Sequence, residues 1–135
     1  MVEKGRFRGN WTFYVGDMTK IANGDIVTQF TPGFAGAIKK WYWVQGGVAV
    51  TTGGKAATLN LEINAVDVNN GSGTDSTIAL ASATCTPMGV VIAGSTIGGA
   101  QSFDDNDTIS IEASSVTAFA EGDGQIVIEY EGKVL

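Results

Sequence analysis

Residues 25–63 read DIVTQFTPGFAGAIKKWYWVQGGVAVTTGGKAATLNLEI, and this stretch decides the fold class. A short apolar run over 26–30 leads into Pro32-Gly33. Proline fixes φ there and glycine supplies the left-handed position, as a type II turn requires. The chain then continues over 37–45, a segment that carries two of the three tryptophans and is expected to be the next strand. Two strands joined by a tight turn are therefore expected here.

Alternation of apolar and polar side chains, which is the period of a β-strand, recurs along the chain. The clearest case is residues 57–64, where Leu59, Leu61 and Ile63 share the apolar parity. A second case runs over residues 5–15. With the shorter apolar runs and the turns between them, about eight short strands are expected. The pattern predicts an all-β fold, an antiparallel β-sandwich with jelly-roll topology favoured.

The domain organisation follows from length and composition. The chain has 135 residues, of which 44% are hydrophobic, enough for one core and one β-sandwich domain over residues 1–135. Because the alternation begins close to the first residue, we expect residues 1–15 to be a strand or arm that is tied into a sheet or engaged with a partner.

The charge of the chain disfavours two classes of partner. The net charge of −6 repels phosphate, so we expect no nucleic acid. There is no apolar run long enough for a transmembrane helix and no apolar segment typical of a secretory signal, so we expect no membrane. The basic residues are few and uneven, and they include Lys4, Arg6 and Arg8 near the start and the pair Lys39-Lys40.

We expect no catalytic residue and no cofactor. Without histidine there is no serine or cysteine triad and no histidine-based zinc site. The lone cysteine, Cys85, lacks a base that would activate it. Glu62, Glu112 and Glu129 could in principle form a carboxylate pair for glycoside hydrolysis, but each lies on the outward parity of its strand and is read as a solubilising charge.

We also expect no metal. Residues 104–107 (DDND) concentrate oxygen ligands, and residues 67–71 (DVNNG) have part of the pattern of a calcium loop. Neither continues to the distal glutamate that completes an EF-hand loop, so both are interpreted as solvated turns.

The strand over 37–45 has two apolar faces. Strict alternation places Ile38, Tyr42 and Val44 on one face and Trp41 and Trp43 on the other. One face belongs to the core. The other requires a cover, which is either a loop of the same chain or another subunit, since exposed aromatic patches usually mark interfaces.

Five segments of the chain carry a resemblance to a known family: NGDIVT (23–28), FTPGFAG (30–36), KAATLNLEI (55–63), CTPMG (85–89) and DTISIEASSVTAF (107–119). They resemble a family of small structural proteins of tailed bacteriophages, the capsid decoration or cement proteins. The similarity covers most of the chain from Ile21 onward and lies in the sequence pattern of the strands rather than in a catalytic motif.

The resemblance implies a structural virion protein that decorates and stabilises the outer surface of the phage head by bridging capsid subunits. It implies the major capsid protein as partner, assembly in the host cytoplasm, and a homo-oligomer, with a trimer favoured over a dimer. We expect capsid or subunit contacts from two groups of residues, an N-terminal group and an aromatic group: Lys4, Arg6, Phe7, Arg8 and Trp11, and Trp41, Tyr42 and Trp43.

The alternative is a head-fibre or appendage module that binds host-surface glycans. Aromatic side chains commonly stack against sugars, and Trp11, Trp41 and Trp43 could form such a platform.

Overall fold

The computed structural model describes residues 6–133, and nearly all of its regular structure is β. The all-β prediction is confirmed, although ten strands are present in the described part rather than about eight, and two of them are only two residues long. A single 3-10 turn, η1 (Met18–Lys20), accompanies the following strands: β1 (Arg6–Val15), β2 (Gly24–Phe30), β3 (Gly36–Gln45), β4 (Ala56–Ile63), β5 (Val66–Asp67), β6 (Thr77–Ala81), β7 (Val91–Ala93), β8 (Ser102–Phe103), β9 (Ile109–Thr117) and β10 (Gly124–Lys133).

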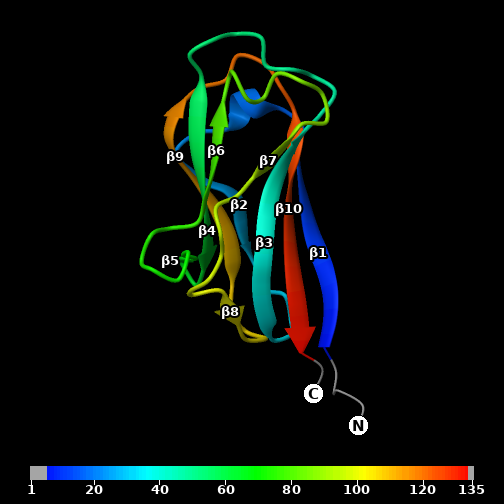
Figure 1. Ribbon diagram of the computed structural model, residues 1–135, viewed down its shortest axis with the longest axis vertical. Helices are drawn as coiled ribbons and strands as arrows, with labels where there is room; N and C mark the ends of the chain where they lie inside the picture. Colours follow the sequence, from blue (N-terminus) through cyan, green and yellow to red (C-terminus); the bar gives the residue numbers. More distant parts are fainter. Residues whose placement is uncertain (1–5, 134–135) are drawn as a thin grey trace.

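The strands form two antiparallel sheets, which confirms the sandwich (Figure 1). We call them sheet A, in the order β1-β10-β3-β7 with β8 also paired to β3, and sheet B, in the order β2-β9-β4-β5 with β6 also paired to β4. The first strand pairs with the last, and the second with the last but one. This nesting of early strands with late ones is the jelly-roll arrangement that the sequence favours.

The core lies between the two sheets and is formed by alternate residues of their strands. On β4 the inward side chains are Leu59, Leu61 and Ile63, as predicted. β9 and β10 contribute matching pairs of buried isoleucines: Ile109 and Ile111, and Ile126 and Ile128. Burying each such side chain stabilises the fold by about 1.5–3 kcal/mol before entropic costs, so this layer is the main source of stability.

The structure corrects the face assignment for β3. Its register against β10 shifts between Glu129 and Tyr130, so that Glu129 faces Lys40 while Tyr130 faces Ile38. Lys39 therefore has no partner on β10 and forms a β-bulge. The residues of β3 before Lys39 consequently point to the opposite faces from those that strict alternation would give them. Ile38 therefore points into the core together with the two tryptophans, whereas strict alternation had separated them.

Trp41 and Trp43 are core residues, with 1% and 0% of their surface exposed. The prediction that they pack against a capsid protein or another subunit is therefore wrong, because sheet B covers this face of β3 from within the chain. Each indole N–H also has an internal acceptor: Trp41 Nε1 donates to Ser76 Oγ at 3.0 Å, and Trp43 Nε1 donates to Gln45 Oε1 at 2.9 Å.

Candidate interaction surface

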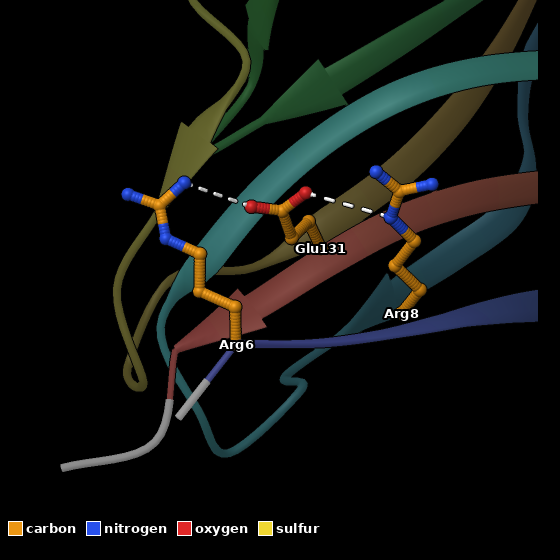
Figure 2. A network of polar contacts seen from close by, with 3 residues as sticks. All are labelled: Arg6, Arg8 and Glu131. Atoms are coloured by element: carbon orange, nitrogen blue, oxygen red, sulfur yellow. Dashed lines mark hydrogen bonds and ion pairs between the residues drawn. The ribbon is translucent and has the colours of Figure 1, made fainter. Parts of the chain in front are cut away.

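The N-terminal strand β1 places its basic residues at one end of sheet A. Arg6 and Arg8 lie on either side of Glu131 on the neighbouring strand β10 (Figure 2). Arg6 Nη1 lies 3.0 Å from Glu131 Oε1, and Arg8 Nε lies 3.7 Å from Glu131 Oε2. Lys4, predicted to belong to the same contact surface, lies outside the described residues.

These ion pairs orient the guanidinium groups but add little stability. The Arg8 side chain is 88% exposed and that of Arg6 is 59% exposed, whereas the Glu131 side chain is only 16% exposed. Exposed pairs of this kind contribute about 0–1 kcal/mol because water screens them. The arginines thus hold positive charge at the surface, where a partner can reach it.

The other two predicted N-terminal residues, Phe7 and Trp11, lie on the opposite face of β1. Phe7 is 37% exposed, and its ring centroid is 5.2 Å from that of Phe34. Trp11 is half-buried and stacks on Tyr130 with centroids 4.5 Å apart. They form an aromatic cluster under the edge of the sandwich, so the structure does not bring them onto the same surface as Arg6 and Arg8.

We define the basic face as the outer surface of sheet A. Its strands carry five of the eight Lys and Arg residues of the chain but, among their described residues, only two outward carboxylates, Glu129 and Glu131. A third carboxylate, Asp123, lies just before β10 at the far end of this face, where it accepts a hydrogen bond from Tyr14. Tyr42 lies half-buried on the face with Lys40 Nζ 5.9 Å from its ring centroid. The chain as a whole carries −6, so this face is opposite in sign to the average surface. The five basic residues are Arg6, Arg8, Lys39, Lys40 and Lys133.

We define the acidic face as the outer surface of sheet B. Asp25, Glu62 and Glu112 come from β2, β4 and β9, and their nearest carboxylate oxygens all lie within 4.8 Å of one another. Asp67 on β5 faces Glu62 across the strand pair. The sequence correctly predicts that Glu62 and Glu112 lie on the outer face of their strands, but Glu62 is buried there by its neighbours and is therefore not a solubilising surface charge. The sequence does not reveal the cluster, because β4 and β9 become neighbours only through the jelly-roll pairing.

The clustering changes the acidity of these groups. Burial raises the pKa of Glu62, of which only 8% is exposed, and the negative charges of Glu112, Asp67 and Asp25 raise it further. Burial and the neighbouring Asp75 likewise raise the pKa of Asp67. Converging carboxylate oxygens are the donor type that hard divalent cations prefer, so Asp25, Glu62 and Glu112 are the residues that could hold one. Ser110 Oγ lies 3.4 Å from Glu62 Oε1 and supplies a hydrogen bond there.

We expect Glu62→Gln to stabilise the protein at neutral pH by on the order of 1 kcal/mol, because it removes a repelled, buried negative charge. Since the pKa of Glu62 is raised on folding, protonation favours the folded state, and the gain should shrink as the pH falls through that pKa. Urea denaturation of both proteins at pH 7.5 and pH 4 measures this. Glu129→Gln, on the basic face, serves as the control, and an equal gain from it would contradict the role of the cluster.

In each of the two loops considered for calcium, some side-chain oxygens accept hydrogen bonds from within the chain. Asp107 accepts hydrogen bonds from the Asp104 backbone N–H and from Asn64 Nδ2, both at 2.8 Å, and these bonds lower its pKa. Asn69 and Asn70 accept hydrogen bonds from backbone N–H groups of their own loop. These contacts are those of ordered turns.

A carboxylate also anchors the glycine-rich loop between β3 and β4. Glu121 accepts hydrogen bonds from the backbone N–H groups of Thr51 and Thr52, at 2.5 Å each, and from both threonine hydroxyls at 2.9 Å. These bonds favour the ionised form and lower the pKa of Glu121 to about 2. The hydrogen bonds tie this loop to the segment before β10.

The lone cysteine is closed to solvent. Cys85 is fully buried, and burial raises the pKa of its thiol. A buried thiol with a raised pKa is a poor nucleophile, since the thiolate is the reactive form. Cys85 is therefore a core residue.

The fold and its surfaces define a class of protein: a jelly-roll β-sandwich with a basic outer face on one sheet and an acidic outer face on the other. Within residues 6–133, no helix has the length and apolar character needed to span a membrane. Comparison with protein-family models and with curated proteins finds no match for this chain.

Proposed function

We propose that this protein is a structural virion protein that decorates the outside of a tailed-bacteriophage head and stabilises it by bridging neighbouring capsid subunits. The observation that carries the proposal is the basic face: an acidic chain gathers most of its basic residues on one rigid sheet surface. Such a surface suits docking on an acidic protein partner, here the major capsid protein. The resemblance of the strand segments to decoration proteins supports the same conclusion.

The mechanism is mechanical. Packaged DNA presses outward on the shell, and a module that contacts two capsid subunits at once adds buried area across their junction. Apolar burial contributes about 25 cal/mol per Å² before the costs of association, so a modest contact at each junction is stabilising. Two contacts made by one rigid body reinforce each other through effective concentration, and repetition over the shell multiplies the effect.

Exposure and position on the sheet select among the residues that we propose for the capsid contact. Arg6, Arg8 and Tyr42 lie on the basic face, where a partner can meet them. Phe7 and Trp11 belong to the aromatic cluster at the adjacent edge and remain partly exposed. Lys4 stays in the proposal as a neighbour of β1 in the sequence, whereas Trp41 and Trp43 leave it because they are buried.

The direct test is to strip heads of this protein, add it back and measure binding and the temperature of head rupture. Rebinding with a higher rupture temperature is the expected result, and absence of binding to such heads would sink the proposal.

Arg8→Glu should weaken rebinding about tenfold, roughly 1.4 kcal/mol, and reduce its salt dependence, because it reverses one exposed charge on the docking surface. The matched control is Lys20→Glu, which makes the same charge change at an exposed residue in η1, outside the basic face. Binding isotherms at two salt concentrations separate the two variants. Equal weakening by both would show that only net charge matters and would contradict docking through this face.

The alternative, a head-fibre or appendage module that binds host glycans, depends on exposed aromatic side chains. Two of its three candidate tryptophans are buried, which leaves Trp11 with Phe7 as the remaining platform. Tryptophan fluorescence in the presence of candidate glycans tests this function, since stacking on Trp11 would change the emission. An unchanged spectrum counts against it.

A further inference from the structure

The edge strands of the two sheets are not protected equally. Folded proteins normally blunt such edges, because an open edge pairs with other chains. In the described residues, β5, β7 and β8 have two or three residues, β6 has five, and β2 is broken by two register shifts. Only β1 is long and regular: it has ten residues without proline, in uninterrupted register with β10.

The outer edge of β1 has an open backbone. Among the described strands β1 pairs only with β10, and it lies outermost in sheet A (Figure 1). Apart from the hydrogen bonds to β10, residues 7–15 make no backbone hydrogen bond within the described part of the chain. Since every second residue of an antiparallel strand directs its N–H and C=O away from its partner, half of these peptide groups face outward and can accept another strand.

We infer that β1 pairs antiparallel with β1 of a second copy of this chain, about a two-fold axis at Asn10. Paired residues must lie on the same face of the joined sheet, so register shifts of one residue are excluded. In the register centred on Asn10, Arg6 faces Tyr14 of the second copy and Arg8 faces Thr12 of the second copy. On the inner face, Phe7 meets Phe13 of the second copy.

The choice of a second copy rests on charge complementarity along the strand. The first end of β1 carries Arg6 and Arg8, whereas the other end lies beside Asp17 and Asp123. Tyr14, which is 72% exposed, donates a hydrogen bond from its hydroxyl to Asp123 Oδ2 at 3.1 Å. Antiparallel pairing brings the arginines of each copy toward this acidic end of the other. Parallel pairing would instead align arginine with arginine.

The inner face also bears on the choice of register. Gly9, opposite Trp11 of the second copy, adds no side chain of its own there, and the space over Gly9 is taken up by the ring of Tyr130 of its own chain. The adjacent register, centred on Trp11, would place two tryptophan rings against each other at the axis. Each of those rings is already stacked on Tyr130 of its own chain.

The pairing would merge the two A sheets into one continuous sheet and place both basic faces on the same side of it. A dimer would thus present two copies of the surface that contains Arg8 and Lys40, which multiplies weak contacts through effective concentration. The inference depends on the edge of β1 and not on the proposed function, so purified protein without any phage head tests it.

Light scattering during size-exclusion chromatography at micromolar concentration should give about twice the 14.0 kDa chain mass. Asn10→Lys and Asn10→Asp should each be monomeric, because each places two like charges at the axis. An equimolar mixture of the two variants should restore the dimer, because opposite charges then meet there. Thr117→Lys, at an exposed position on β9, should leave the dimer intact.

Far-UV circular dichroism of each variant establishes that it is folded; Asn10 is exposed, so the monomers should retain the β spectrum. A wild-type monomer or trimer would overturn the inference, since a three-fold ring cannot pair identical edges with each other. Dimers of the single variants, or a mixture that remains monomeric, would overturn it as well.

Discussion

Replacing Trp43 with alanine is expected to lower the free energy of unfolding by about 3–5 kcal/mol. Trp43 is fully buried between the sheets, and its removal leaves a large cavity and an unpaired Gln45 Oε1. Much of the stability of a domain of this size, typically about 5–15 kcal/mol, would be lost. Urea denaturation followed by circular dichroism measures the change without relying on tryptophan emission.

The matched control is Tyr42→Ala, the neighbouring residue on β3, which is half-buried on the basic face. It should cost about 1 kcal/mol, because its ring is not enclosed by the core. If Tyr42→Ala cost more than Trp43→Ala, the face assignment of β3 would be reversed, and the original expectation of a tryptophan interface would return.

The second large effect is expected at Gln45, a fully buried amide in the core. Its Oε1 accepts from Trp43 Nε1 at 2.9 Å, and its Nε2 donates to the Val48 carbonyl at 2.9 Å and contacts Met18 Sδ at 3.5 Å. Gln45→Met keeps the side-chain length but leaves the indole N–H and the Val48 carbonyl without these partners. A buried group without its partner costs about 1–3 kcal/mol, so we expect a loss of about 2–3 kcal/mol.

A double-mutant cycle isolates the hydrogen bond from packing. Trp43→Phe removes the donor, so Gln45→Met should cost less in that background than in the wild-type protein by about 1 kcal/mol. The four proteins are compared by urea denaturation at one pH. Strictly additive losses would mean that the Trp43–Gln45 contact contributes nothing beyond the size of the two side chains.

The two outer faces of the sandwich differ in charge, and this difference determines which sheet a charged partner would contact. A partner with negative charge would meet sheet A, while sheet B, with Asp25, Glu62 and Glu112, would turn away from it. The open edge of β1 borders the basic face, so strand pairing between copies and docking on a capsid can occur together. The Asn10 variants and the Arg8 variant therefore test two separable contacts.

The local pattern of the sequence predicts much of the fold. Alternation in residues 57–64 places Leu59, Leu61 and Ile63 in the core, and the structure confirms it. This works because side chains on a regular strand alternate between its faces whatever the strand pairs with. The same rule fails on β3, where the bulge at Lys39 adds one residue and shifts the parity of everything before it.

The candidate surfaces were predicted only in part. The concentration of Arg6 and Arg8 near the start of the chain is visible in the sequence, and the structure keeps both at the surface. Phe7 and Trp11, which belong to the same predicted contact group, lie on the other face of the strand, as the alternation over residues 5–15 indicates. The Glu62 cluster had no local signal, because its members lie on three strands that are far apart in the sequence.

The sequence by itself determined the fold class and the inward side chains of the regular strands, since these depend on local periodicity and on total apolar content. Only the tertiary structure decided which strands are neighbours, which face of β3 the tryptophans occupy and which edge stays open. Those properties depend on pairing between distant segments. A bulge or a shared sheet edge changes the pairing without leaving a mark in the local pattern of residues.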